Sequence, residues 1–151
     1  MKFLLTPELE GLARWLRLLG YDAKTLPPAE VPRCHQRAIA EWRILVTRDG
    51  DIQPHPEVQM IRVRSDQWRR QLRQVVRDSA IDARRAPVGS RCNRCNVTLR
   101  PRTRQAVRHR VPPYVYATQT SFQECPRCRR IFWRATHWGR ITDVFHSIGR
   151  G

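Results

Sequence analysis

The sequence is poor in acidic residues and almost without lysine. Its 29 lysine and arginine residues face 13 aspartate and glutamate residues, for a formal net charge of +16, and only Lys2 and Lys24 are lysines. Arginine presents a planar fork of donors that matches phosphate oxygens and can stack on bases, so this charge favours nucleic acid as a partner. A GC-rich genome, which raises the number of arginine codons, is the alternative source of the excess.

The sequence also lacks an apolar run of about 18 residues, which argues against a membrane-spanning helix. No lipidation motif or basic amphipathic stretch stands out, so a membrane is not an expected partner. The apolar stretch after Met1 ends at Thr6, too early for the apolar region of a signal peptide. Four of the five cysteines form CxxC pairs, and Cys34 has no evident disulfide partner. We therefore expect a cytoplasmic protein.

Short apolar runs alternate with segments of helical periodicity in the first half of the chain. Strands are expected over 2–5, 21–25, 43–47 and 58–63, and helices over 8–19, 33–42 and 66–78. Thr6 suits the start of the first helix and Gly20 its end. This alternation predicts an α/β fold, with a mostly parallel sheet covered by helices and with ligands beyond the carboxyl ends of its strands.

The pattern changes after Ile81, where charged residues, Pro87 and Gly89 precede the cysteine pairs. We therefore expect an α/β domain over 1–86 and a small basic domain over 87–151. Residues 1–88 carry a net charge of +5, and residues 89–151 carry +11. The shorter part of the chain holds most of the charge.

The two CxxC pairs, Cys92 with Cys95 and Cys125 with Cys128, are separated by 29 residues. Each pair can turn two thiolates toward one point, and four thiolates make the closed tetrahedral shell typical of structural zinc. A redox role for either CxxC pair would require a thioredoxin-like βαβ pattern around it, and the sequence shows none. The spacer is long enough for a β-hairpin, with strands expected over 107–116 and 121–124. These features predict a zinc ribbon.

Basic residues crowd the ribbon, where they are interleaved with aromatic residues such as Phe132 and Trp133. Such a surface can neutralise phosphates and stack unpaired bases. The alternative is that the aromatic residues form the small core of the ribbon and the arginines are only solvated. The expected RNA-binding residues are Arg14, Arg17, Arg48, Arg100, Arg102, Arg104, Arg108, Arg110, Arg129, Arg130, Arg134 and His137.

The candidate catalytic groups are Asp22, Asp49 and Asp51, with Glu30 and Asp66 further away in the sequence. Metal-dependent phosphodiester cleavage needs carboxylates that converge on Mg²⁺ or Mn²⁺. Asp49 follows an apolar run and is expected at the carboxyl end of a buried strand. The alternative for Asp49 and Asp51, which flank Gly50, is a turn-forming role.

Several motifs together resemble the PIN-like ribonuclease family named for the C-terminal domain of the nematode Mut-seven exonuclease. They are LARWLRLLGYD at 12–22, ILVTRD at 44–49, the paired CxxC knuckles, VPPYVY at 111–116 and THW at 136–138. The resemblance covers nearly the whole chain. It implies a PIN-like α/β domain followed by a zinc ribbon, and a metal-dependent ribonuclease activity.

The sequence departs from the pattern of this family at its first strand. The family normally ends this strand with the first metal-binding aspartate, and Thr6 stands in that place here. The acidic residues before the second helix are thinned to Glu30. A site reduced to Asp49, Asp22 and either Asp51 or Glu30 would hold Mg²⁺ poorly, because this ion needs closely placed carboxylates.

Three functions remain open from the sequence. The first is an RNA-binding protein on a PIN-like ribonuclease scaffold whose metal-dependent nuclease site is weakened or lost. The second is an active ribonuclease that uses Asp49, Asp22 and a substitute ligand to hold Mg²⁺ or Mn²⁺. The third is a module that docks on a ribosome or a protein partner. Ribosomal RNA and tRNA are the candidate RNA partners.

Overall fold

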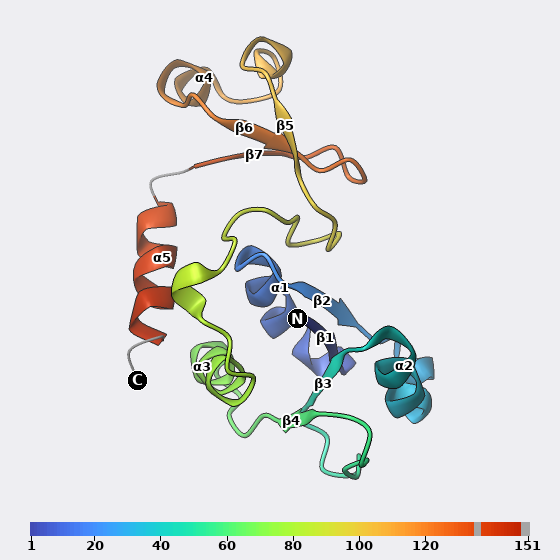
Figure 1. The fold of residues 1–151 in the computed structure, drawn as a ribbon. Helices are drawn as coiled ribbons and strands as arrows, with labels where there is room; N and C mark the ends of the chain where they lie inside the picture. Colours follow the sequence, from blue (N-terminus) through green and yellow to red (C-terminus); the bar gives the residue numbers. More distant parts are fainter. Residues whose placement is uncertain (135–136, 149–151) are drawn as a thin grey trace.

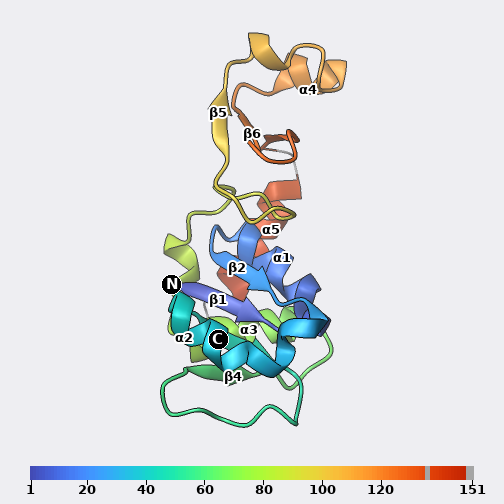
Figure 2. The ribbon, with the colours of Figure 1, turned by 90° about the vertical axis from the view of Figure 1, so that its right-hand side faces the viewer.

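A computed structural model describes residues 1–134 and 137–148 of the protein, without the side chains of 137–141. Two sheets organise the chain (Figure 1). The first belongs to the N-terminal α/β part, and the second to a smaller part that stands above it in Figure 2. We call residues 1–86 the α/β domain and residues 91–134 the ribbon.

The α/β domain is built on a four-stranded sheet in the order β2-β1-β3-β4. Every neighbouring pair of its strands is parallel. The strands are β1 (Lys2–Leu5), β2 (Asp22–Thr25), β3 (Ile44–Thr47) and β4 (Met60–Arg62). The expected parallel sheet flanked by helices is confirmed, with a fourth strand shorter than expected.

Helices cover both faces of this sheet. The helices are α1 (Glu10–Leu18), α2 (Cys34–Glu41), α3 (Trp68–Asp78) and α5 (His137–Ile148), with 3-10 helices at Pro7–Leu9, Pro28–Arg33 and Ala83–Arg85. Side chains alternate across a strand, so Phe3 and Leu5 of β1 join the cluster that includes residues of α1, α3 and α5. Leu4, between them, packs on the opposite face with residues of α2. The result is a layered α/β/α domain.

Helix α1 ends as the sequence predicts, at Gly20. The Gly20 N–H donates to the carbonyl of Arg17 at 2.9 Å and the Tyr21 N–H to that of Leu16 at 3.0 Å, which is a Schellman motif. The motif needs a left-handed residue, and Gly20 has a φ of 93°. A Cβ at this position would lie 2.2 Å from the carbonyl oxygen of Pro87, so the absence of a side chain also lets the following linker approach.

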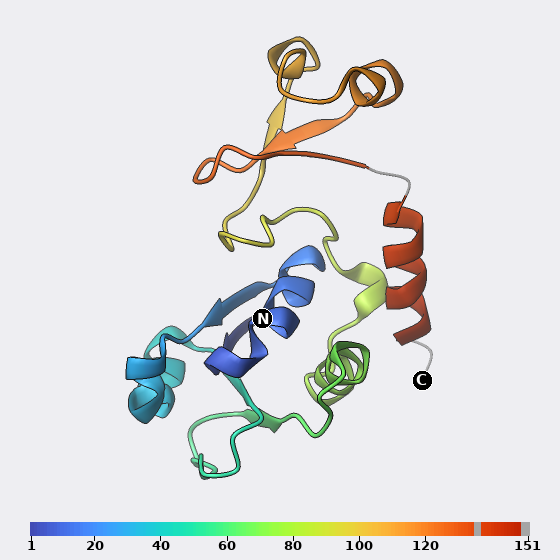
Figure 3. The ribbon, with the colours of Figure 1, turned by 180° about the vertical axis from the view of Figure 1, so that it is seen from behind.

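The C-terminal helix α5 returns from the ribbon to the α/β domain, as Figure 3 shows. Phe145 and Ile148 of α5 are buried in the larger apolar cluster. Trp15 of α1 stacks on Trp68 of α3, with ring centroids 4.0 Å apart, and meets Phe145 edge to face at 6.3 Å. The boundary at residue 86 stays a prediction, but the last helix packs with the first part of the chain.

The ribbon holds a three-stranded antiparallel sheet in the order β5-β6-β7. Its elements are β5 (Arg100–Arg102), a 3-10 helix (Gln105–Val107), α4 (Pro113–Thr118), β6 (Phe122–Glu124) and β7 (Ile131–Trp133). The strand expected over 107–116 is wrong. Pro112 and Pro113 have no N–H to donate to a sheet, whereas Pro113 suits the first turn of a helix. Arg100–Arg102 supplies the hairpin strand instead.

No helix within 1–134 and 137–148 is long and apolar enough to cross a membrane.

Candidate metal centre and arginine-rich surface

The four cysteines of the two CxxC pairs come together at one point. Their sulfur atoms all lie within 4.8 Å of one another, and those of Cys92 and Cys128 are 3.9 Å apart. A tetrahedral ion with metal–sulfur bonds of about 2.3 Å places its sulfurs about 3.8 Å apart, so the spacing suits a metal such as zinc. The expectation that these cysteines can form one metal site is confirmed, and zinc as the metal stays a prediction.

The two knuckles share one backbone design. In the first, the Cys95 N–H donates to the sulfur of Cys92 at 3.4 Å, and Asn96 follows with a φ of 60°. In the second, the Cys128 N–H donates to the sulfur of Cys125 at 3.4 Å, and the next residue has a φ of 65°. These donors stabilise thiolates, the form in which cysteine binds a metal.

Asn96 fastens the first knuckle to the α/β domain. Its side-chain oxygen accepts the Ala23 N–H at 3.0 Å, and its amide nitrogen donates to Asp22 at 2.7 Å. Arg17 adds to this junction, since its guanidinium donates to the carbonyls of Ala23 at 2.7 Å and Asn93 at 3.1 Å. Arg17 is buried, so in this structure it is not available for contact with RNA.

Asp22 lies at the amino-terminal edge of the sheet, since it opens β2 in register with Lys2. Its carboxylate makes a bidentate pair with Arg43, at 2.8 and 3.1 Å. Partial burial raises the pKa of Asp22, but hydrogen bonds from Arg43 and Asn96 outweigh it and lower the pKa below its usual value. Asp49 follows the carboxyl end of β3, at the opposite edge. The structure therefore does not bring Asp22 and Asp49 into one site.

Two threonines occupy the carboxyl edge between β1 and β3. Thr6 and Thr47 are buried, and their hydroxyl oxygens lie 3.0 Å apart. The Thr6 hydroxyl donates to Glu8 at 2.5 Å, and the Thr47 hydroxyl accepts the Asp49 N–H at 3.0 Å. Two hydroxyl groups thus occupy the place where the family resemblance puts a metal-binding aspartate, and the nearest carboxylate in their hydrogen-bond network is that of Glu8.

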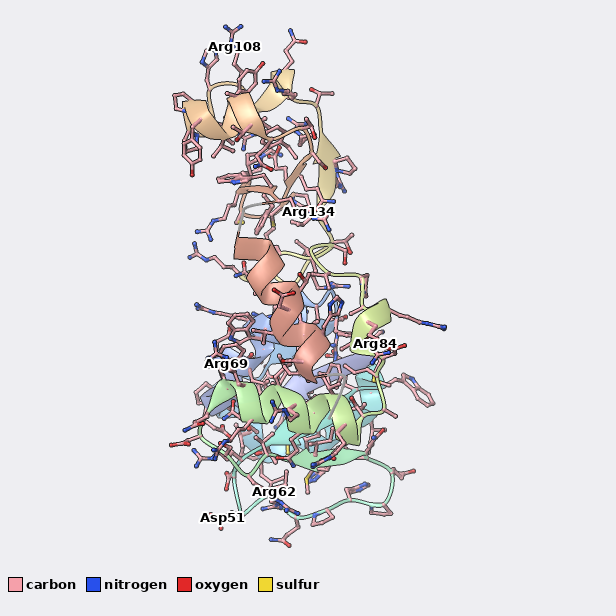
Figure 4. The ribbon with its side chains drawn as sticks, turned by 90° about the vertical axis from the view of Figure 1, so that its left-hand side faces the viewer. Asp51, Arg62, Arg69, Arg84, Arg108 and Arg134 are labelled. Atoms are coloured by element: carbon pink, nitrogen blue, oxygen red, sulfur yellow. The ribbon has the colours of Figure 1, made fainter. Side chains whose placement is uncertain are left out.

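An open cavity of about 410 Å³ lies beside these threonines, lined by Glu8, Arg48 and Asp49. The Arg48 N–H donates to Glu8 at 3.0 Å, and Asp49 accepts the Asp51 N–H at 2.9 Å. Asp51 is exposed and belongs to the turn, at the end of the molecule away from the ribbon (Figure 4). Among the described residues, the four cysteines are the only group of three or more His, Cys, Asp and Glu placed to hold a metal.

Three of the ribbon arginines share one carboxylate. Glu124 of β6 has a side chain only 3% exposed, and it pairs with Arg102 at 2.8 Å, Arg110 at 3.1 Å and Arg129 at 2.8 Å. The hydrogen bond from Arg110 is the main cause that lowers the pKa of Glu124. The cluster keeps a net positive charge, but its arginines first serve to hold the ribbon together.

The other arginines of the ribbon differ in whether the protein already uses their side chains. Arg104 stacks over the ring of Tyr116 at 4.1 Å and donates to its carbonyl. Six exposed arginines of the ribbon have no side-chain partner among the described residues, namely Arg94, Arg100, Arg108, Arg127, Arg130 and Arg134. Figure 4 shows Arg108 at the far end of the ribbon and Arg134 nearer to α5.

The remaining expected RNA contacts lie elsewhere. Arg14 and Arg48 are exposed on the α/β domain, and Arg14 makes a 3.5 Å pair with Glu10 one helical turn away. His137 begins α5, and its side chain lies outside the part of the chain whose side chains are described.

Sequence reasoning missed three residues that the structure makes prominent. Glu8 faces the cavity beside Asp49. It is an acidic residue only two positions after Thr6, and this closeness to the end of the first strand could have indicated it. Trp42 is 89% exposed and Tyr114 is 71% exposed, although both are large and aromatic. No periodicity in the sequence marks these two as surface residues.

A family model described as Mut7-C RNAse domain matches residues 1–145. No curated protein and no solved structure matches the chain.

Proposed function

The chain belongs to the Mut7-C RNAse domain family, and from this membership we propose that it is an RNA-binding protein whose metal-dependent nuclease site is weakened or lost. The observation that carries the proposal is the set of exposed ribbon arginines without a side-chain partner among the described residues, which includes Arg100, Arg108, Arg130 and Arg134. Guanidinium groups that the protein does not use itself are available to phosphates.

The carboxyl edge of the sheet supports the second half of this proposal. Thr6 and Thr47 hydrogen-bond to each other there, and hydroxyl groups cannot supply the negative charge that Mg²⁺ or Mn²⁺ requires. Glu8 and Asp49 leave only two carboxylates at the cavity. The residues present therefore fit a catalytic cation poorly, and we assign no cleavage step to it.

The four-cysteine site fits zinc, which would act as a structural ion because four thiolates leave no open coordination position. Reduced cysteines of this kind suit the cytoplasm, where we place the protein. Metal analysis of the purified protein should give one zinc ion per chain, and none after substitution of Cys92 by serine.

RNA binding is tested by titrating a labelled single-stranded RNA with the protein at several salt concentrations. The affinity should fall steeply as salt rises, because phosphate contacts release counterions. The double variant Arg108→Gln with Arg130→Gln should bind more weakly, with a slope of log affinity against log salt that is smaller by about 1.4, since each contact to a single strand contributes about 0.7.

The matched control is Arg70→Gln with Arg73→Gln, which removes the same charge from two exposed arginines of α3. It should leave the salt slope nearly unchanged. Absence of binding at low salt would overturn the proposal. Equal losses in the two double variants would show that only net charge matters.

An active ribonuclease is the second candidate, because Glu8 and Asp49 line the same cavity. It requires Mn²⁺-dependent cleavage by the unaltered protein that disappears in both Glu8→Gln and Asp49→Asn. If the site is weakened, restoring the missing carboxylate should increase cleavage. Thr6→Asp, which returns a carboxylate to the end of β1, should then cleave RNA faster than the unaltered protein.

A further inference from the structure

A second cavity, of about 250 Å³, lies on the side of the ribbon that faces the α/β domain. Its walls are the strands β6 and β7, the linker residues Val88 and Gly89, and Thr142 of α5. It is separate from the cavity lined by Glu8 and Asp49 and from the cysteine site. Most of the polar and aromatic side chains that line it come from β6, from β7 and from the residues that adjoin these strands, and the hydroxyl of Thr142 comes from α5.

One wall of the cavity is the face of the ribbon sheet that turns toward the linker and α5. Gln123 is paired with Phe132 across the two strands, and Ser121 and Arg134 extend the same row beyond the neighbouring pair Phe122 and Trp133. Side chains alternate between the faces of a strand, so Ser121, Gln123, Phe132 and Arg134 share one face. Phe122 turns to the other face, into the small core of the ribbon.

Three chemical groups meet at this face. Phe132 offers an aromatic ring, and it also packs against the apolar cluster around the cysteines, which fixes its position. The Gln123 amide, able both to donate and to accept, has no side-chain hydrogen bond among the described residues. Arg134 is exposed and has no ion pair there. An aromatic ring, an unused amide and an unused guanidinium match the three parts of a nucleotide: the base face, the base edge and the phosphate.

The size of the cavity limits what it can hold. Sites for drug-sized ligands measure about 300 to 1,000 Å³, and this cavity falls just below that range. A single planar base fits such a volume, whereas a base pair or a nucleoside triphosphate does not. The charge of the ribbon around it favours a base that arrives on a polyanionic strand.

We propose that this cavity binds the base of one unpaired RNA nucleotide, with Phe132 stacking on the base, the Gln123 amide hydrogen-bonded to its edge and Arg134 paired with the adjoining phosphate. The inference rests on the RNA-binding function proposed above. It adds a base-dependent contact to a surface that otherwise recognises only phosphates, and it gives the ribbon a means to distinguish single-stranded from duplex RNA.

The first test compares two short single strands of equal length, one with all its bases and one built only of abasic nucleotides. Phosphate contacts are equal in both, so any difference in affinity comes from bases. The intact strand should bind about tenfold more tightly, since stacking of one base on an aromatic ring gives on the order of this gain. Phe132→Leu keeps an apolar side chain against the cysteine cluster. It should reduce the difference in affinity between the intact and the abasic strand to about twofold. The zinc content of this variant checks that the ribbon is folded.

The second test separates the edge of the base from its face. Gln123→Leu keeps the shape of the side chain but removes the amide, and it breaks no hydrogen bond among the described residues. Affinities for pentamers of A, C, G and U should differ by several fold in the unaltered protein and become equal in Gln123→Leu. The free nucleoside monophosphates should show the same order of preference at much weaker affinity.

The third test uses two arginines of different parts of the chain: Arg134, which lines the cavity, and Arg84 of the α/β domain, which lies below it in Figure 4. Both are exposed and without a side-chain partner among the described residues. Arg134→Gln should weaken binding of the intact pentamer about fivefold more than Arg84→Gln does. Equal effects would contradict the role of Arg134.

The outcomes distinguish this inference from the function on which it rests. Salt-dependent binding that is identical for the intact and abasic strands leaves RNA binding in place and overturns the cavity as a base site. A base-dependent difference that persists in Phe132→Leu and Gln123→Leu also overturns it, because the bases then bind elsewhere. Absence of binding to either strand at low salt overturns both.

Discussion

The α/β domain and the ribbon are held together by different means. In the α/β domain, 16 residues form one buried apolar cluster together with Phe145 and Ile148 of α5, and a second cluster covers the other face of the sheet. The ribbon has a core of five buried residues, and it adds the four-cysteine site and the arginines gathered around Glu124. A small module cannot bury enough apolar surface to fold on that alone. The ion pairs, and a metal ion if the four cysteines hold one, would supply the missing stability.

This difference bears on function. The α/β domain uses many of its side chains to form its apolar core. The ribbon uses few side chains for its core and exposes most of the others. The cavity beside Gln123 and Phe132 lies on the part of the molecule with the smaller core, together with six exposed arginines that have no side-chain partner among the described residues. The α/β domain also exposes unpaired arginines, such as Arg84, but has no such cavity beside an aromatic ring among the cavities described above. The ribbon can therefore carry the binding surface, while the α/β domain supports it through α5 and the junction at Asn96.

Loss of the four-cysteine site should produce the largest difference in stability between the two parts. A structural zinc ion contributes about 10 kcal/mol to folding in small modules. Cys92→Ser, or a strong chelator, should unfold the ribbon and leave the α/β domain folded. Limited proteolysis should then cut within 97–134, and amide exchange should remain slow in β1 and β3. Loss of protection throughout both parts would contradict independent stabilisation.

Gly20→Ala should disturb the junction between the parts. Its φ of 93° and the Pro87 carbonyl, 2.2 Å from the new Cβ, leave no room without a backbone shift. The free energy of unfolding should fall by about 3 kcal/mol. Gly11→Ala is the matched control, because no atom lies within 4 Å of its Cβ and alanine favours the helix. It should raise stability by about 1 kcal/mol. Urea denaturation measures both.

Arg17→Met should weaken the same junction from the side of α1. Arg17 is buried and donates to two carbonyls and to Glu10, at 3.0 Å, which would all lose a partner. The expected loss of stability is about 2 kcal/mol. Arg14→Met, on the exposed face of the same helix, should cost less than about 0.5 kcal/mol. Similar values for the two would contradict the structural role of Arg17.

Glu41→Gln should affect the α/β domain alone and in a pH-dependent way. Hydrogen bonds from Lys24 and then Arg43 lower the pKa of Glu41 from 4.5 to about 2. Because the folded-state pKa is depressed, the contribution is complete above about pH 4.5 and is lost as the pH falls toward 2. After allowance for solvent screening it is about 1 kcal/mol. Denaturation at pH 7 and at pH 2.5 should show the difference shrink, with zinc affinity at pH 7 unchanged.

Trp42→Gly should have the smallest effect and the opposite sign. Trp42 ends α2 with a φ of 55°, where glycine is favoured, and it is 89% exposed, so little apolar burial is lost. Relief of backbone strain should raise the stability of the α/β domain by about 0.5 kcal/mol, after the entropy cost of glycine in the unfolded chain. A fall in melting temperature would show that the indole contributes to packing.

Local patterns were sufficient for most of the α/β domain. Apolar runs and helical periodicity located the strands and the main helices, and Gly20 marked the end of α1 by a backbone requirement that only glycine meets easily. The same reasoning failed over 107–116, where β-branched and aromatic residues suggested a strand. The two prolines at 112 and 113 decided for a helix.

The sequence was a poorer guide to which residues share the candidate site. Asp22 and Asp49 are both acidic residues beside strands, but Asp22 begins its strand and Asp49 follows the end of another, so parallel pairing places them at opposite edges. Likewise, Arg17 and Arg14 look alike in sequence. Which of them is buried depends on the side of α1 against which the first knuckle packs.

The sequence by itself determined the parallel sheet, the four-cysteine site and the excess of positive charge, because periodicity, CxxC spacing and composition are local or additive properties. Only the tertiary structure decided which arginines are free, that Thr6 meets Thr47 at the carboxyl edge, and that Gln123, Phe132 and Arg134 share one cavity. These are contacts between residues distant along the chain, and their energies depend on burial and geometry that no single segment contains.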